Sequence, residues 1–266
     1  MRARRTVAVA CLFLFACDAH EDDEHETAPS GAVTAGAVLD AVDESGNPLR
    51  FRVDGVEPDP RDKGGDVLLY ALSVLQEGRE PEPYCVPDIE GKRLAIPVQG
   101  SWDARGGFHD DPKRITFACT SGAIAKCIRF GYKPWKTVAG RSLAEHHAAC
   151  IRMVRADYCG DGISHTKDGT RIDLWDEVGV QSRDEVTAQP EVFEAAWSPE
   201  GAVYLSKPRW SEDVEDIVKL CPDKLRGRTA KDVTLAPTEV SQRFPEAKLF
   251  NARFVRNEDR MQKPAP

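Results

Sequence analysis

Apolar and polar residues alternate in the first half of the chain with the period of a β-strand. From residue 49 to 56, apolar side chains at every second position predict a strand that is buried on one face. Three further apolar runs are too short to span a membrane as helices, so we predict strands at 67–75, 93–98 and 115–119. The segment 103–112 is dense in Gly, Asp and Pro and is predicted to be an exposed loop.

The pattern changes to a helical period after residue 120. We predict helices at 121–130, 142–157 and 211–221, and strands at 172–180 and 202–205. Ser121 and Ser211 each stand where an N-cap residue is expected, and Ser142 with Glu145 has the spacing of a capping box. These elements predict an α+β fold that is mainly antiparallel β with a few short helices.

The N-terminus has the pattern of an export signal. Arginines at positions 2, 4 and 5 precede an uncharged apolar run over 7–16, which is too short to span a bilayer as a helix. The sequence Leu-Phe-Ala-Cys at 14–17 resembles a lipobox, after which the cysteine is acylated and becomes the first mature residue. We therefore predict a signal peptide at 1–16 and lipidation of Cys17. The alternative is ordinary secretory cleavage after Ala19, without a lipid.

An acidic, flexible tether is predicted to follow Cys17. Six carboxylates fall within 18–26, and small residues dominate the stretch up to residue 36, so the segment 17–36 cannot bury apolar surface. A single domain is then expected over 37–221, with residues 222–266 as a C-terminal extension. Lipidation would place this domain at a bacterial membrane, exposed to the periplasm or to the cell surface.

The charge of the mature chain argues against nucleic acid as a partner. Removal of the three signal arginines leaves 33 basic residues against 44 acidic ones, which gives a formal net charge of −11. Binding to a phosphate backbone requires a basic surface. Nucleic-acid-binding proteins are therefore an improbable class for this chain.

Six cysteines remain in the mature domain once Cys11 is removed with the signal and Cys17 carries lipid. An even number in an oxidising compartment predicts three disulfides, although the sequence does not select among the 15 connectivities. A zinc site is the weaker alternative, because no two cysteines have the C-x2-C spacing of zinc ligands. The six residues are Cys85, Cys119, Cys127, Cys150, Cys159 and Cys221.

The segment Arg-Ala-Asp-Tyr-Cys-Gly-Asp-Gly at 155–162 closely resembles the signature of the ADYC domain family. Similar stretches surround it: Gly-Ser-Trp-Asp at 100–103, Gly-Tyr-Lys-Pro-Trp at 131–135 and Phe-Glu-Ala-Ala-Trp at 193–197. The resemblance covers roughly residues 85–221. It implies an exported bacterial protein, with lipoproteins among the relatives, and it implies no particular activity because none is established for the family.

Carboxylates gather around one histidine in and after the signature. An enzyme would use His165 as general base, oriented by Asp161 or Asp168, although no nucleophile motif accompanies it. A calcium loop would use Asp161, Asp168 and Asp173, although their spacing does not fit an EF-hand. The alternative is structural: the Asp-Gly pairs form turns, and Asp157 is held by a buried arginine, with Arg152, Arg155 and Arg171 as the candidates.

No P-loop, Rossmann or HExxH motif is present, so we expect no cofactor, with calcium as the one ion to consider. The favoured function is a non-catalytic, membrane-anchored module of the cell envelope that binds a carbohydrate, a peptide or a neighbouring envelope protein through its exposed loops. The alternative is a secreted hydrolase or a metal-dependent enzyme with its site around 157–173.

Overall fold

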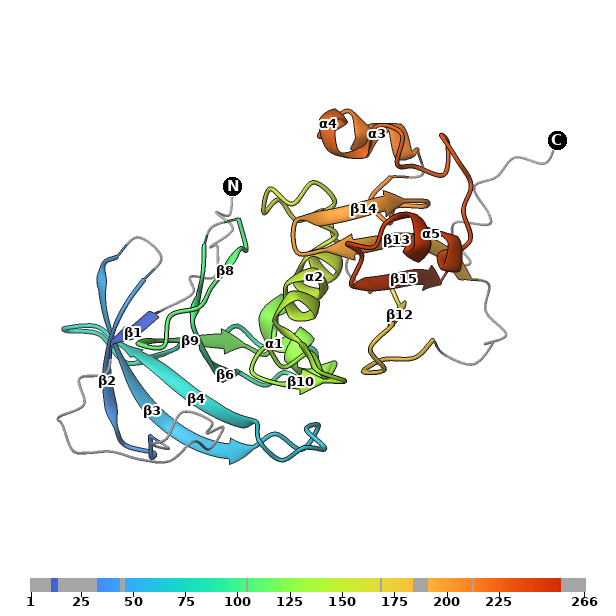
Figure 1. The fold of residues 1–266 in the computed structure, drawn as a ribbon. Helices are drawn as coiled ribbons and strands as arrows, with labels where there is room; N and C mark the ends of the chain where they lie inside the picture. Colours follow the sequence, from blue (N-terminus) through green and yellow to red (C-terminus); the bar gives the residue numbers. More distant parts are fainter. Residues whose placement is uncertain are drawn as a thin grey trace. The chain divides into compact units, whose positions relative to one another are not determined.

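The structure is a computed structural model that describes residues 33–43, 46–103, 105–167, 169–183, 191–211 and 213–254, together with the backbone of 11–13. The chain forms two compact units. The N-terminal unit comprises Met1–Ala104 and Phe108–Arg129, and the C-terminal unit comprises Arg105–Gly107 and Phe130–Pro266. Figure 1 shows the elements of both units. Among the described residues, no helix combines the length and apolar character needed to cross a bilayer.

The N-terminal unit is built on one antiparallel sheet with the strand order β3-β2-β1-β9-β6-β4-β5. Strand β3 also pairs with β4, so the hydrogen-bonded strands close into a ring. The strands are β1 (Cys11–Phe13), β2 (Val38–Val42), β3 (Pro48–Pro58), β4 (Leu68–Leu75), β5 (Glu82–Pro83), β6 (Leu94–Gln99) and β9 (Arg114–Cys119). The helix α1 (Ala123–Arg129) follows β9. Predicted strands 49–56, 67–75, 93–98 and 115–119 are thereby confirmed.

Alternation along β3 explains the core of this unit. Phe51 and Val53 are fully buried, whereas the arginines on either side of Phe51 point to solvent. Both apolar side chains belong to a cluster that includes the Cys85–Cys119 disulfide, whose Cα atoms are 5.5 Å apart. The disulfide therefore stabilises this unit in addition to the burial of apolar surface.

The N-terminal unit differs from the prediction in the loop 103–112 and in the strand β1. The predicted loop 103–112 contains a short strand, β8 (Phe108–His109), which pairs with β7 (Ser101–Trp102), so the loop prediction is wrong at that point. The ring of strands includes β1, which pairs with β2 and β9 but lies within the predicted signal peptide. Cys17 and nearly all of the predicted tether lie outside the described residues.

The C-terminal unit contains a four-stranded antiparallel sheet with the order β12-β15-β13-β14. Its strands are β12 (Ile172–Asp176), β13 (Glu191–Ser198), β14 (Gly201–Leu205) and β15 (Leu249–Phe254). A two-stranded ribbon, β10 (Thr137–Val138) and β11 (Arg141–Ser142), precedes α2 (Ala144–Arg155). The segment expected to be a C-terminal extension supplies β15, a central strand, so residue 221 is not a boundary of this unit.

Helices cover the sheet of the C-terminal unit, as its continuous burial along β13 and β14 requires. Helix α2 contacts β13, β14 and β15, and α5 (Pro237–Arg243) contacts β13. The side chains of Val240 and Phe244 pack with Ala196 and Tyr204 of the sheet. Two short helices, α3 (Val214–Val218) and α4 (Pro222–Leu225), lie between β14 and α5 in the chain. The predicted fold class is confirmed.

The predicted helix caps are wrong in two places. Leu143 precedes α2 without a side-chain cap, because Ser142 pairs in β11 and Glu145 forms an ion pair with Lys248 instead of reaching back. Asp213, not Ser211, caps α3 by accepting a hydrogen bond from the backbone N–H of Glu215. Ser142 still accepts the N–H of Ala144 at 3.2 Å, but it stands one residue before the observed cap position, whereas at α3 the cap belongs to Asp213.

The predicted strand 172–180 is shorter than expected. Strand β12 ends at Asp176, because the Asp176 carboxylate accepts hydrogen bonds from the backbone N–H groups of Val178, Gly179, Val180 and Gln181. A carboxylate that bonds the backbone just ahead of it stabilises a turn in place of a strand.

Candidate functional site: the loop 156–163

The signature loop begins where α2 ends. Ala156 caps the helix in the left-handed region, with φ at 51°, and its N–H donates to the carbonyl of Met153. This conformation costs a non-glycine residue about 1–2 kcal/mol. Ala156 is also fully buried, so the alanine fits the packing of this turn despite the strain.

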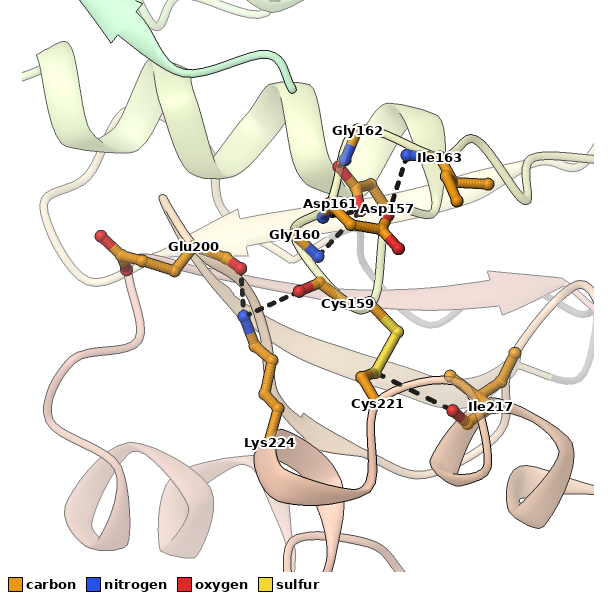
Figure 2. Close-up of a disulfide and its surroundings, with 10 residues drawn as sticks. All are labelled: Asp157, Cys159, Gly160, Asp161, Gly162, Ile163, Glu200, Ile217, Cys221 and Lys224. Atoms are coloured by element: carbon orange, nitrogen blue, oxygen red, sulfur yellow. Dashed lines mark hydrogen bonds between the residues drawn. A yellow bond between two sulfur atoms is a disulfide. The ribbon is translucent and has the colours of Figure 1, made fainter. Parts of the chain in front are cut away.

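The loop winds around the carboxylate of Asp157, which is fully buried (Figure 2). Oδ1 accepts the backbone N–H of Gly160 at 2.8 Å and that of Asp161 at 3.1 Å, while Oδ2 accepts the N–H of Gly162 at 3.0 Å. Oδ2 also lies 2.5 Å from Nη1 of Arg152. Arg152 is therefore the buried partner among the three arginines considered, and both carboxylate oxygens are used to shape the loop.

Tyr158 directs its hydroxyl group into a second buried network. The hydroxyl donates to Oε1 of Glu194 at 2.8 Å, and it accepts the backbone N–H of Arg209. Glu194 is also bound by Nε of Arg209 at 2.8 Å and by Nδ2 of Asn251 at 2.8 Å. Asn251 in turn accepts the indole N–H of Trp197 at 2.7 Å. The network thus joins the signature loop to β13 and β15.

Burial and the charge of Glu194 both shift the pKa values of Tyr158 and Arg209. Burial raises the pKa of Tyr158 well above its ordinary value, and the Glu194 carboxylate raises it further. Burial alone would lower the pKa of Arg209, but its ion pair with Glu194 outweighs that effect and raises the pKa. Glu194 and Arg209 therefore form a buried ion pair beside a neutral phenol, an arrangement that fixes geometry rather than one poised for proton transfer.

Cys159 fastens the loop to a distant part of the chain. Its disulfide to Cys221 has a Cα–Cα distance of 5.7 Å and spans 62 positions of the sequence (Figure 2). Cys127 and Cys150 are disulfide-bonded as well, so all six mature-domain cysteines are in bridges, and the prediction of three disulfides is confirmed. None of these six sulfur atoms is left as a thiolate for zinc.

Gly160 lies against the turn between β13 and β14. It has φ at 72°, and a Cβ at this position would meet the carbonyl oxygen of Glu200 at 1.6 Å. The Nζ of Lys224 donates to the same Glu200 carbonyl and lies 3.4 Å from the carbonyl of Cys159 (Figure 2). Burial lowers the pKa of Lys224. The loop is consequently held by a backbone contact, a disulfide and a lysine bridge.

The outer side of the loop is exposed and partly aromatic. Ile163 is 57% exposed and Trp210 is 47% exposed. The ring of His165 lies between two aromatic rings, with centroids 4.7 Å from Trp210 and 6.2 Å from Tyr158. We call Ile163, His165 and Trp210 the outer face of the loop.

The residues predicted for an enzyme or a calcium site do not share one arrangement in the described part of the chain. The imidazole of His165 makes no hydrogen bond to Asp157, Asp161 or Asp173 there. Asp161 accepts the N–H of Ile163 in a turn, and Asp173 lies on β12 with its Oδ2 at 3.6 Å from Nε of Arg183. Asp168 lies outside the described residues. No three His, Cys, Asp or Glu side chains of the described residues are grouped to hold a metal ion.

Sequence reasoning missed the buried ion pair and the exposed tryptophan. Glu194 lies on a strand whose other inner residues are apolar, and Arg209 is 15 residues away in the chain, so no local pattern links them. The signal that was available in the sequence is a charged residue among apolar neighbours: Glu194 stands between Phe193 and Ala195, and Arg209 stands between Pro208 and Trp210.

Comparison with known proteins agrees with the signature. A family model for the ADYC domain matches residues 31–211. The chain belongs to the ADYC domain family. The match begins before β2 and ends after Trp210, so the domain includes the N-terminal sheet as well as the signature loop. No curated protein and no solved structure matches the chain.

Proposed function

We propose that this ADYC protein is an exported, lipid-anchored binding module of the bacterial cell envelope and is not an enzyme. The lipobox-like sequence before Cys17 supports the anchor. Complete disulfide bonding of the six mature cysteines supports an oxidising compartment, where such bridges form and persist. The acidic segment after Cys17 would act as the spacer between lipid and domain.

The observation that carries the binding role is the use of Asp157. A catalytic carboxylate must reach a substrate, whereas the oxygens of Asp157 are fully buried and bonded to Arg152 and to the loop backbone. The outer face, in contrast, offers an exposed indole beside a histidine, and large exposed aromatic rings are typical of recognition surfaces. We therefore assign the partner contact to the outer face.

The anchor is tested by replacing the acceptor cysteine. Cys17→Ser in the full chain should move the protein from the membrane fraction to the soluble fraction, or stop its maturation. Cys11→Ser, a change within the same signal, should leave it in the membrane fraction. Firm membrane attachment of a Cys17→Ser protein from which the signal has been removed would overturn the lipid anchor.

The binding role is tested with the unlipidated chain, so that the lipid does not contribute. The Cys17→Ser protein should sediment with purified cell envelopes, and Cys17→Ser/Trp210→Ala should sediment several-fold less. Cys17→Ser/Leu220→Ala removes another exposed apolar side chain and serves as the matched control. Equal sedimentation of all three would reject the outer face, and turnover of an envelope substrate that is lost in a His165→Ala variant would favour the hydrolase alternative.

A further inference from the structure

The C-terminal unit contains a cavity that is separate from the signature loop. Its volume is about 560 Å³, which lies in the range of small-molecule sites. Three segments form it: the start of α2, the turn after β12 and the chain just before β15. The lining residues are Arg141, Ser142, Glu145, His146, Glu177, Val178, Pro245, Ala247 and Lys248.

A buried imidazole forms part of the cavity wall. His146 is only 5% exposed and stacks on Tyr132, with ring centroids 6.3 Å apart and planes 12° from parallel. Tyr132 is fixed in turn, because its hydroxyl donates to Oδ2 of Asp176 at 2.8 Å. Among the described residues, Nδ1 of His146 has no partner that meets hydrogen-bond geometry. Nδ1 is itself shielded from solvent, so the wall presents a rigid aromatic ring to the cavity and not an open hydrogen-bonding atom.

The imidazole is mainly neutral near pH 7. Burial lowers the pKa of His146, and the Lys248 ammonium lowers it further. The carboxylate of Asp176, a hydrogen bond with the backbone of Ser142 and the carboxylate of Glu145 act in the opposite direction without reversing the shift. A neutral imidazole adds no charge to the cavity wall, so the charged side chains alone set the electrostatic character of the cavity.

Four charged side chains line the cavity, and two of them neutralise each other. Nζ of Lys248 lies 2.8 Å from Oε2 of Glu145. Neither Arg141 nor Glu177 has an ion pair or a side-chain hydrogen bond with another residue of the described ranges, and both are exposed to solvent. The cavity thus presents one available positive charge and one available negative charge beside a neutral imidazole.

This charge pattern selects among ligand classes. A simple anion would be attracted by Arg141 and repelled by Glu177, and a simple cation would meet the reverse situation. A metal ion lacks a ligand set, since the carboxylates and the imidazole are not grouped for coordination in the described part of the chain. A molecule with both charges satisfies both side chains at once.

We propose that the cavity binds a small zwitterion that carries a carboxylate and an ammonium group, of amino-acid to dipeptide size. Arg141 pairs with the carboxylate, where its planar guanidinium favours a two-point contact, and Glu177 pairs with the ammonium group. The neutral ring of His146 forms part of the wall and adds no charge of its own. This site is independent of the lipid anchor and of the outer face of the loop.

The test uses alanyl-alanine as the probe and the unlipidated Cys17→Ser chain as the protein. Titration followed by calorimetry should show saturable binding. Two analogues each lack one charge: N-acetyl-alanyl-alanine lacks the ammonium group, and alanyl-alanine amide lacks the carboxylate. Each should bind at least about tenfold more weakly than alanyl-alanine, which is the loss expected for one charge-assisted hydrogen bond. Absence of saturable binding, or equal binding of all three peptides, would overturn the proposal.

Two variants assign the contacts. Arg141→Gln should weaken alanyl-alanine about tenfold and abolish its advantage over the amide, and Glu177→Gln should abolish its advantage over the acetylated peptide. Both side chains are exposed, so neither change threatens the fold. The exposed Arg226→Gln and Glu80→Gln are the matched controls and should keep the full discrimination. Discrimination that survives in Arg141→Gln and Glu177→Gln would place the binding elsewhere.

Discussion

The hydroxyl oxygen of Tyr158 lies 2.8 Å from Oε1 of Glu194, and both side chains are fully buried. Glu194 receives two further donors, from Arg209 and Asn251. A buried ion pair is stable only when its remaining hydrogen-bonding positions are filled, and the tyrosine fills one of them. The tyrosine of the signature is thus a structural partner of a charge on β13.

Removal of that hydroxyl group should destabilise the fold. Tyr158→Phe leaves one oxygen of Glu194 and the backbone N–H of Arg209 short of a partner, which costs about 1–3 kcal/mol. Urea unfolding of the two proteins measures the difference. Tyr84→Phe is the control, because Tyr84 is only partly buried, so water can replace the partners of its hydroxyl and the loss should cost less.

Neutralising Asp157 should have a larger effect than neutralising its neighbour Asp161. Asp157→Asn leaves the buried guanidinium of Arg152 without its counter-charge, and breaking such a pair costs about 3–5 kcal/mol. Asp161→Asn keeps a side-chain oxygen for the N–H of Ile163 at an exposed position, so its effect should stay within about 0.5 kcal/mol. Thermal unfolding distinguishes the two, and equal losses would contradict the role assigned to Asp157.

Gly160 should be intolerant of any side chain. Gly160→Ala would drive a Cβ into the carbonyl of Glu200, and we expect a loss above about 4 kcal/mol or failure to accumulate as folded protein. Gly227→Ala is a matched control, since Gly227 also has positive φ, at 75°, but has open space around it. Its cost should be about 1–2 kcal/mol, the strain of the left-handed conformation alone. Comparable losses for both glycines would show that the close approach is unimportant.

His146 should make the stability of the protein depend on pH in the mildly acidic range. Because its pKa in the folded protein lies below the ordinary value near 6.5, the unfolded chain binds the proton first. The free energy of unfolding should therefore fall as the pH falls from about 6.5 towards the lower pKa of the folded state. Urea unfolding at several pH values should show a smaller slope in His146→Gln than in the parent. An unchanged slope in His146→Gln would contradict the role assigned to His146.

The parts of this structure that the sequence predicted are those determined by neighbouring residues. The alternation in 49–56 requires one buried face, and β3 has it; the segment 202–205 is continuous and apolar, and β14 is buried throughout. The predicted cap positions were wrong at Ser142 and Ser211, because α2 begins one residue later and Asp213 caps α3. The arginine beside Asp157 was expected, but only the packing of α2 selects Arg152. Nothing local brings Glu194 and Arg209 together, since the folded sheet does so.

Three of the four residues that name the family are fully buried in this chain, and the fourth has no free thiol. Ala156, Asp157 and Tyr158 have no exposed surface, and Cys159 is sealed in a disulfide. A partner molecule cannot contact the three buried side chains. These residues therefore specify the conformation of the loop, and the exposed residues around the loop determine which partner is bound. Two proteins that share these four letters would then share a scaffold, and each would be free to recognise a different partner.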